Sequence, residues 1–280
     1  MEEHLQRTIN RTVSWNGVGV HTGETVEMTV EPAPPGAGIV FETAGKRVRA
    51  DASSIAQSER NTTLSGDGVT IHTVEHVLAA LWGMGVDNAL VRVSAPEPPA
   101  MDGSAMPFVE KIEEAGLKIQ HEKRLFIKID QPVYLFDPGA DTGMIAVPYP
   151  SFRVTYVLDY THPLIGSQCF EAEMTPANFA AKIAPARTFV LEGEVQELIA
   201  KGLARGGSPD NAVVFHENRT SSRLRFENEP ARHKMLDIVG DFALLGKRLK
   251  GHVIAERTGH AHNHAFVKEI IARCGHKREI

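Results

Sequence analysis

Residues 232–241 carry side chains that could hold a metal ion. The segment reads RHKMLDIVGD, which places His233 and Asp237 four positions apart. On a helix this spacing puts both side chains on one face, close enough to bind one ion. Imidazole nitrogen and carboxylate oxygen are both good zinc ligands, and Asp241 continues the same face one turn later. A surface ion pair accounts for the spacing at least as often, so both interpretations stay open here.

Residues 73–76 read TVEH and place Glu75 beside His76. Neighbouring helical side chains point roughly 100° apart, because a helix has about 3.6 residues per turn. The two do not readily bind one metal, but a ligand and a carboxylate base could lie on either side of a water molecule. A polar first helical turn, in which the helix dipole favours glutamate, is the simpler interpretation of these residues alone.

Histidine is frequent toward the end of the chain, where six of the thirteen lie in residues 233–276. Surface histidines and histidines used in metal or proton-transfer chemistry explain this count equally well. His260 is the better functional candidate, because Gly259 before it permits a tight backbone. His262 and His264 are expected early in the next helix, where they would be exposed.

Thr188 lies in the run ARTF at 186–189. Its hydroxyl could donate a hydrogen bond to an oxyanion that develops during a reaction. A residue at the entry to a strand explains the threonine better when it is considered alone.

The composition limits the class of protein. The chain has 280 residues, enough for one large domain or two smaller ones. Its formal net charge of -5 argues against a general nucleic-acid binder. Two cysteines outside any CxxC pair argue against a disulfide framework or a thiolate zinc site, and fit a reducing cytoplasm. Residues 1–10 lack the apolar run of a secretory signal, and no stretch approaches the roughly 18 apolar residues of a membrane span.

Strands and helices must position these side chains. Apolar and polar residues alternate at 26–30, which predicts a strand. Helices are predicted at 73–81 with a threonine cap, at 230–245 with proline in the first turn, and at 262–274. Runs of strands followed by helices favour an α+β fold over an alternating α/β fold. Both halves of the chain show this order, and the polar segment 116–124 between them is the predicted domain boundary.

Eight short runs follow one another along nearly the whole chain. They are GVGVHTG at 17–23, TVEH at 73–76, APE at 95–97, MDGSA at 101–105, ARTF at 186–189, RGGS at 205–208, HKMLD at 233–237 and TGHA at 258–261. One such run would carry little weight. In their order and spacing, the runs resemble one family: UDP-3-O-acyl-N-acetylglucosamine deacetylase, the zinc amidase of lipid A synthesis.

The resemblance implies two similar α+β domains, at 1–122 and 123–280, each with a sheet packed against helices and with the active site at their interface. It also implies that His76, His233 and Asp237 are zinc ligands. Three protein ligands leave a fourth position for water, which is the catalytic arrangement. Ferrous iron (Fe2+) also suits nitrogen and carboxylate ligands, so it could be the metal used in the cell.

The resemblance implies a role for five further side chains in amide hydrolysis. Glu75 would take a proton from the attacking water as general base. The Thr188 hydroxyl would help to hold the oxyanion. His260 would protonate the departing amine as an imidazolium, and Asp241 would orient it and keep its pKa high. Lys234 would supply positive charge near the phosphates or the water.

Substrate contacts follow from the same resemblance. The family binds an acyl chain in an apolar channel built on an insert, which here would lie near 191–215 and include Leu198. Tyr160 lies where the resemblance suggests stacking on uracil, and ring stacking suits a nucleobase. His21 and Phe189, in two of the matching runs, are the other expected substrate contacts. Burial of the insert side chains against their own domain is the alternative.

The expected substrate is an amphiphilic acylated UDP-sugar, and no nucleic acid is expected to bind. The protein is expected to be a cytoplasmic monomer that contacts a membrane surface at most transiently. A zinc amidase acting on another acylated compound and a binding module without catalysis are the alternatives. Glu75 and His260 argue against the second, because a binding module needs no base and acid beside a metal. His262 and His264 depart from the family pattern, and these extra rings could bind a second, inhibitory metal or have no role.

Overall fold

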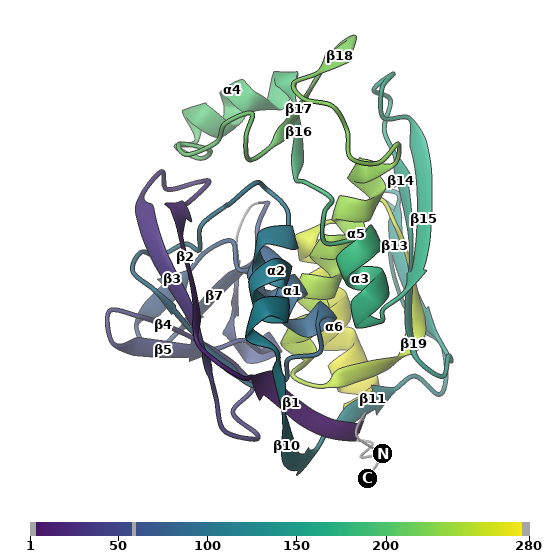
Figure 1. Ribbon diagram of the computed structural model, residues 1–280. Coiled ribbons are helices and arrows are strands. Elements are labelled where there is room, and N and C mark those ends of the chain that lie inside the picture. Colours follow the sequence, from purple (N-terminus) through teal and green to yellow (C-terminus); the bar gives the residue numbers. More distant parts are fainter. Residues whose placement is uncertain (1–3, 58–59, 276–280) are drawn as a thin grey trace.

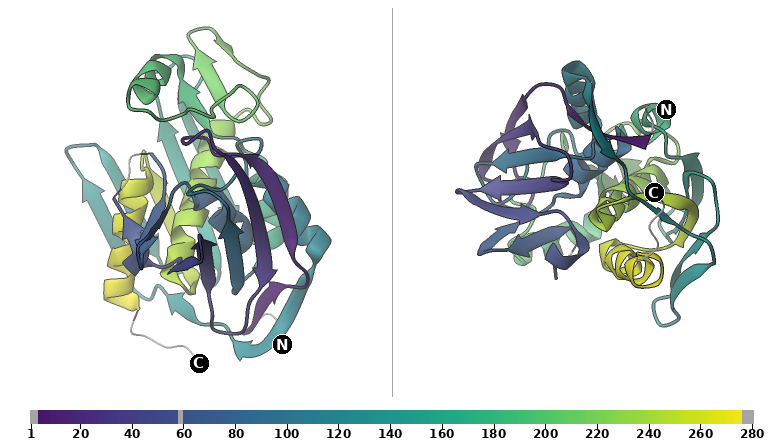
Figure 2. Two further views of the ribbon diagram at one scale, coloured as in Figure 1. Left: turned by 90° about the vertical axis from the view of Figure 1, so that its left-hand side faces the viewer. Right: turned by 90° about the horizontal axis from the view of Figure 1, so that it is seen from below.

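The helices of the chain form the centre of the molecule. A computed structural model describes residues 4–57 and 60–275. The helices are α1 (Glu75–Gly83), α2 (Met106–Ala115), α3 (Pro176–Lys182), α4 (Glu192–Ala200), α5 (Glu229–Phe242) and α6 (His260–Cys274), with short 3-10 turns η2 (Ala52–Ser54) and η3 (Ala243–Leu245). Figures 1 and 2 show α1, α5 and α6 between two sheets, whereas α4 stands apart at the top of Figure 1.

The first sheet contains five strands from the first part of the chain. Its order is β2 (Val13–Val18), β3 (Thr25–Pro32), β9 (Ala89–Val93), β4 (Ile39–Thr43) and β5 (Lys46–Arg49). The predicted strand at 26–30 is confirmed within β3, where Val26, Met28 and Val30 are buried in the core and Glu27 is exposed. This alternation gives the sheet one apolar face for the central helices and one polar face.

The second sheet comes from the later part of the chain. Its strands are β12 (Val133–Asp137), β13 (Thr142–Val147), β19 (Arg248–Glu256), β14 (Phe152–Asp159) and β15 (Ser167–Glu173) in spatial order, and β11 (Phe126–Lys128) also pairs with β19. Val154, Tyr156 and Leu158 of β14 turn into the core, as their alternation with polar residues requires. With helices packed on two mainly antiparallel sheets, the predicted α+β fold is confirmed.

Three smaller sheets complete the fold. The strand β1 (Leu5–Ile9) pairs with β10 (Leu117–Lys123), and β6 (Ile55–Ala56), β7 (Thr63–Gly66) and β8 (Val69–Ile71) form a second small sheet. The third contains β16 (Phe189–Leu191), β17 (Val213–His216) and β18 (Arg219–Thr220), and lies beside α4 at the top of Figure 1. None of the helices in the described part of the chain combines the length and the hydropathy that crossing a membrane requires.

Strand pairing bears on the predicted domain boundary. The polar segment 116–124 is largely strand β10, which pairs with β1. Within residues 4–57 and 60–275, every strand pairing joins strands from the same side of residue 124. This pattern supports a division near residue 124, since Lys123 still pairs with Leu5; the predicted boundary between residues 122 and 123 stays a prediction.

Helix α1 begins two residues later than predicted. Thr73 has φ of 54°, a left-handed backbone conformation that β-branched residues rarely adopt. Its hydroxyl donates a hydrogen bond of 2.8 Å to Oε1 of the buried Glu97, and Val74 takes the N-cap position instead. The prediction that Thr73 caps the helix was wrong, because its side chain is directed to a buried carboxylate rather than to the helix N-terminus.

Helices α1 and α5 cross in contact at Gly240. A Cβ atom at this position would lie 2.2 Å from the carbonyl oxygen of Glu75. Only glycine therefore allows the first turn of α1 to approach α5 this closely. The crossing places Glu75 and His76 opposite the middle of α5.

We expect the substitution Gly240→Ala to destabilise the fold by about 1–3 kcal/mol, because the added methyl group must displace the Glu75 backbone. Urea unfolding measures this change. Gly193→Ala is the matched control, since a Cβ atom on this α4 residue meets open space; there the helix propensity of alanine should add up to about 1 kcal/mol. Equal stability of the two variants would contradict a tight crossing at Gly240.

Candidate active site

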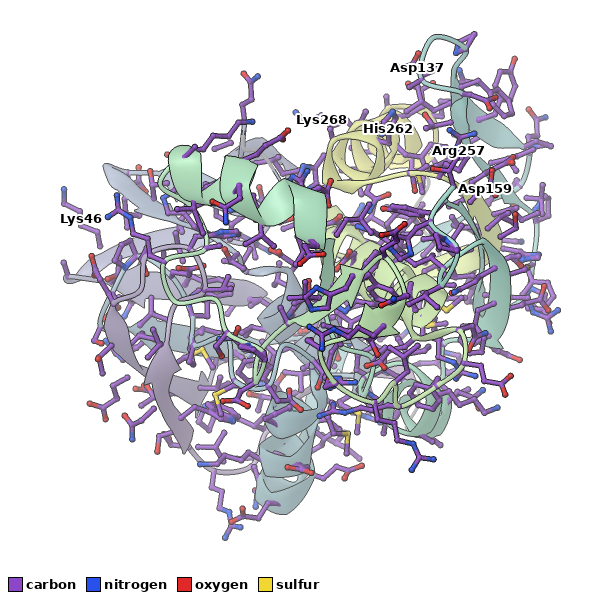
Figure 3. All side chains as sticks on the ribbon, turned by 90° about the horizontal axis from the view of Figure 1, so that it is seen from above. Lys46, Asp137, Asp159, Arg257, His262 and Lys268 are labelled. Atoms are coloured by element: carbon purple, nitrogen blue, oxygen red, sulfur yellow. The ribbon has the colours of Figure 1, made fainter. Side chains whose placement is uncertain are left out.

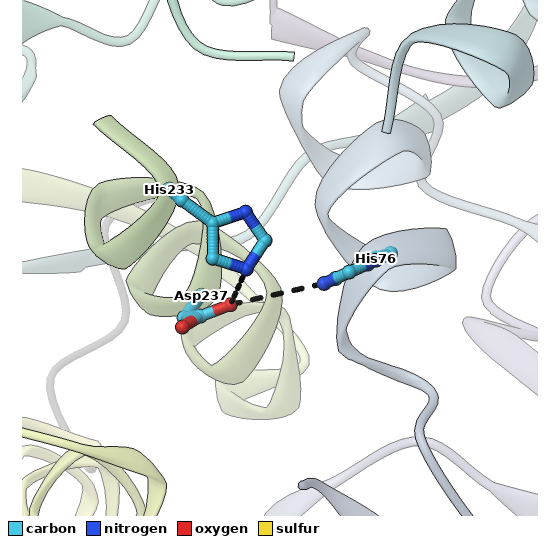
Figure 4. A group of neighbouring side chains, drawn as sticks. All are labelled: His76, His233 and Asp237. Carbon is cyan, nitrogen blue, oxygen red and sulfur yellow. Dashed lines mark ion pairs between the residues drawn. The ribbon is translucent and has the colours of Figure 1, made fainter. Parts of the chain in front are cut away.

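The α1–α5 crossing brings together the three predicted metal ligands. His76 comes from α1, while His233 and Asp237 lie one turn apart on α5. Nε2 of His233 is 3.4 Å from Oδ1 of Asp237, and Nε2 of His76 is 4.0 Å from the same oxygen. Figure 4 shows both rings directed at this carboxylate. The three ligand atoms lie within 4.8 Å of one another, a spacing that one ion can bridge.

The surroundings of these atoms fit a divalent cation. Oδ1 of Asp237 is buried, yet it accepts no hydrogen bond from the described residues, and such an atom is costly without a partner. Nδ1 of His233 lies 3.0 Å from the carbonyl oxygen of Ala186. If Nδ1 donates there, Nε2 keeps its lone pair toward Asp237. Tetrahedral zinc with bonds of about 2.0–2.1 Å separates its ligands by about 3.3 Å, close to the 3.4 Å between His233 and Asp237 and shorter than the 4.0 Å between His76 and Asp237.

The pKa values of these three residues are shifted in the directions that metal binding requires. Burial, together with the neighbouring His233, lowers the pKa of His76 to about 3. Burial also lowers the pKa of His233, so both rings are neutral at pH 7. Burial alone would raise the pKa of Asp237, but its interactions with His233 and Lys234 hold it below its ordinary value. Two neutral imidazoles and one carboxylate are the protonation states in which these groups bind zinc.

Glu75 lies on the other side of His76, within reach of the same centre. Oε2 of Glu75 accepts a hydrogen bond of 2.9 Å from the backbone N–H of Thr62, and Oε1 lies 3.9 Å from Nε2 of His260. Burial raises the pKa of Glu75 to about 7, despite the opposing charge of His260. A carboxylate with this pKa can accept and release a proton near neutral pH.

His260 is held by a buried carboxylate. Its Nδ1 lies 2.9 Å from Oδ2 of Asp241, which also accepts a hydrogen bond of 2.8 Å from Nδ2 of Asn263. Burial alone would lower the pKa of His260, but the charges of Asp241 and Asp237 raise it to about 10. The ring is therefore an imidazolium at neutral pH, with Nε2 directed toward Glu75 and Asp237. A base and an acid thus face each other beside the three predicted ligands.

Lys234 and Thr188 lie at the edge of this group. Nζ of Lys234 is 3.4 Å from Oδ2 of Asp237 and 5.9 Å from the ring centre of Phe189. Burial alone would lower the pKa of Lys234, but the charge of Asp237 raises it above its ordinary value. Thr188 lines a small apolar pocket together with His76, and its backbone N–H donates to Gly103 at 2.8 Å.

The predicted substrate contacts lie around one end of the site. Tyr160 packs edge-on against Phe189, with ring centres 5.9 Å apart. Leu198 is buried on α4. The backbone N–H of His21 donates to the Glu97 carboxylate at 3.1 Å, and its Nδ1 accepts a hydrogen bond of 3.3 Å from the backbone N–H of Ala204 in the predicted insert. The structure thus joins Tyr160 to Phe189 and His21 to Ala204 in the predicted insert, and Leu198 lies within that insert.

His264 corrects an expectation from the sequence. It was expected to be exposed, but α6 begins at His260, two residues earlier than predicted, and His264 is buried. The helical repeat then turns positions 260, 263 and 264 inward. His262 is half-buried, and its Nε2 lies 2.9 Å from the Thr142 hydroxyl and 3.9 Å from Asp137 (Figure 3).

His264 forms a second possible metal-binding group with Asp241 and His260. Its atoms differ from those of the first group, because they already have protein partners. Oδ1 of Asp241 accepts a hydrogen bond from Thr62, and Oδ2 accepts from His260 and Asn263. The geometry therefore favours a hydrogen-bonded network at this second group and a metal at the first.

Two residues of the site carried no signal in the sequence. Thr62 contacts both Glu75 and Asp241, and the fully buried Glu97 ties Thr73 to the loop around His21. Thr62 lies in a run of polar residues, and Glu97 belongs to the matching run APE but has no predicted role of its own. The i, i+4 spacing of His260 and His264 could have revealed the buried face of α6 if the helix start had been placed correctly.

Comparisons with known proteins show the family of this chain. The chain matches the family described as LpxC: UDP-3-O-acyl N-acetylglycosamine deacetylase over residues 6–272. It belongs to this deacetylase family. It is 41% identical over 273 residues to the UDP-3-O-acyl-N-acetylglucosamine deacetylase of Syntrophotalea carbinolica, a region that covers 95% of this chain and 88% of that protein. It is 40% identical over 277 residues to the protein of the same name from Chlamydia caviae, with 97% and 98% covered.

Membership of the deacetylase family confirms the resemblance predicted from the eight short runs. The matched range, residues 6–272, includes every one of them. It also includes α1, α5 and most of α6, the three helices that carry the candidate ligands, base and acid.

Proposed function

We propose that this member of the deacetylase family is a zinc-dependent amide hydrolase that removes the N-acetyl group of UDP-3-O-acyl-N-acetylglucosamine in lipid A biosynthesis. The products are acetate and a free glucosamine amine. The substrate follows from the names of relatives about 40% identical over nearly the whole chain. The zinc follows from the candidate ligand set His76, His233 and Asp237.

One observation carries the proposal. The buried Oδ1 of Asp237, without a hydrogen bond from the described residues, faces Nε2 of two imidazoles. Glu75 and His260 lie beside the same point, 3.9 Å apart. A structural metal site needs no titratable pair next to it, whereas amide hydrolysis needs both a base and an acid.

The roles of the side chains follow from their protonation states. When bound, the cation supplies Lewis acidity, which polarises the acetamide carbonyl and makes water more acidic. Glu75, as a carboxylate, accepts a proton from the attacking water. His260, held as an imidazolium by Asp241, donates a proton to the departing amine nitrogen. The Thr188 hydroxyl donates a hydrogen bond to the carbonyl oxygen as its negative charge grows.

Substrate binding uses the residues around the insert. Leu198 and its neighbours on α4 line the path of the acyl chain, while Tyr160 stacks on uracil. Phe189 and His21 complete the walls of the site, and Lys234 adds positive charge near the phosphates or the water. This assignment is supported by where the side chains lie and, for His21, Phe189 and Lys234, by the matching runs that contain them.

The cellular setting completes the proposal. The enzyme is a cytoplasmic monomer of two α+β domains, 1–122 and 123–280, that contacts a membrane surface transiently to reach its amphiphilic substrate. Two cysteines in 280 residues support a reducing compartment. Zinc is the metal favoured by the ligand set, and ferrous iron suits the same ligands in the cell.

The zinc-loaded protein should release acetate from UDP-3-O-acyl-N-acetylglucosamine. Removing the acyl chain should lower kcat/KM by at least about 100-fold, because the buried methylene groups contribute binding energy to the reaction. A chelator should abolish turnover, and added zinc should restore it. Equal rates with and without the acyl chain would count against this substrate.

His76→Ala should weaken zinc binding by at least about 100-fold, because it removes a direct ligand rather than an outer partner. Metal analysis after dialysis against a mild chelator measures the loss. His262→Ala is the matched control, since His262 contacts Thr142 and is not one of the three candidate ligands. This variant should keep one zinc per chain. Stoichiometric zinc in the His76 variant would remove this residue from the ligand set.

Glu75→Gln should keep zinc but lower kcat by about 10²–10⁴-fold, because glutamine has the shape of glutamate and accepts no proton. Acetate release and metal content are measured on the same preparation. Retained turnover with normal zinc content would exclude Glu75 as the general base.

A further inference from the structure

Thr62 lies at the centre of a buried network that no catalytic role yet explains. Its hydroxyl oxygen is 2.5 Å from Oδ1 of Asp241, 2.9 Å from Nε2 of His264 and 3.2 Å from Nδ1 of His260. Its backbone N–H donates to the Glu75 carboxylate at 2.9 Å. Thr62 is fully buried. Thr62 therefore contacts the proposed base Glu75 through its backbone N–H. Through its side chain it contacts Asp241, which holds the proposed acid His260.

The directions of these hydrogen bonds follow from the groups involved. An ionised carboxylate only accepts, so the single hydroxyl proton of Thr62 goes to Asp241. The hydroxyl oxygen must then accept a hydrogen bond from Nε2–H of His264. A chain of donors results, from His264 through Thr62 to Oδ1 of Asp241, while His260 donates to Oδ2 of the same carboxylate.

The backbone of Thr62 also holds the start of α1. Its carbonyl oxygen accepts a hydrogen bond of 3.1 Å from the N–H of Val74, the residue before Glu75. Strand β7 begins at the next residue, Thr63, so Thr62 is attached directly to a sheet. Thr62 therefore holds the backbone just before Glu75 through its carbonyl oxygen, and the Glu75 carboxylate itself through its N–H.

We propose that Thr62, supported by His264, is a positioning residue that fixes the spacing between the general base Glu75 and the Asp241–His260 pair. This inference rests on the proposed deacetylase function. Without the hydroxyl, Oδ1 of the fully buried Asp241 would lose its closest donor. The carboxylate could then turn away from His260, and the base and acid would no longer be held 3.9 Å apart.

Three variants of the zinc-loaded, full-length chain test the proposal. Thr62→Val keeps the shape of the side chain but removes the hydroxyl, and Thr62→Ser restores the hydroxyl. Thr63→Val is the matched control, because the buried Thr63 hydroxyl donates to Asn61 at 2.9 Å and lies near His72, away from Asp241. The readouts are kcat, KM, zinc content and the urea midpoint of unfolding.

Thr62→Val should lower kcat by about 10–100-fold, as loss of an outer partner does at other metal sites, with zinc content and KM close to wild type. Thr62→Ser should recover most of the lost kcat. Thr63→Val should shift the unfolding midpoint but leave kcat unchanged. A kcat for Thr62→Val equal to that of Thr63→Val, or a serine variant as slow as the valine variant, would overturn the proposal.

The wild-type chain separates this inference from the proposed function, because a wild-type protein without acetate release would reject the deacetylase activity itself. The network has a test that needs no turnover. Thr62→Val and His264→Asn should shift the unfolding midpoint non-additively, since either change breaks the same hydrogen bond. Strictly additive shifts would show that the two side chains are independent, and would overturn the network even in an inactive protein.

Discussion

The contact between Gly240 and the Glu75 carbonyl is the constraint on which the site depends. It lets the first turn of α1 lie against the middle of α5, so that His76 faces His233 and Asp237. Any larger residue at 240 would separate the two helices, and the ligand atoms would move apart with them. The candidate metal group His76, His233 and Asp237 is thus a consequence of how the two helix backbones pack.

Burial then decides what each charged group can do. Asp237 and Asp241 lie one turn apart on α5, and both are buried. Both oxygens of Asp241 accept hydrogen bonds, from Thr62, His260 and Asn263. Oδ1 of Asp237 has none among the described residues, which suits the cation that we propose for this site. In the proposed enzyme, the two buried carboxylates therefore have different roles: Asp237 binds the metal, and Asp241 keeps an imidazole protonated.

The sequence predicts the local part of this arrangement and misses the rest. The i, i+4 spacing of His233 and Asp237 indicated a shared helix face, and the eight short runs indicated the family. The strained Thr73 could not be predicted, because its left-handed φ depends on the distant Glu97 carboxylate. Thr62 was missed for a similar reason: its partner Asp241 is 179 positions away, and its residue type is common on surfaces.

The same long-range contacts make the site depend on how the two halves of the chain pack. His76, Glu75 and Thr62 precede residue 124, whereas the remaining ligands and the acid follow it. Neither half alone contains a complete ligand set or both members of the acid–base pair. Displacement of α1 from α5 would therefore remove the proposed metal binding and the proposed proton transfer together, even with every side chain unchanged. Thr62 connects the two halves of the proposed acid–base pair, because its backbone N–H binds Glu75 and its hydroxyl binds Asp241, the partner of His260.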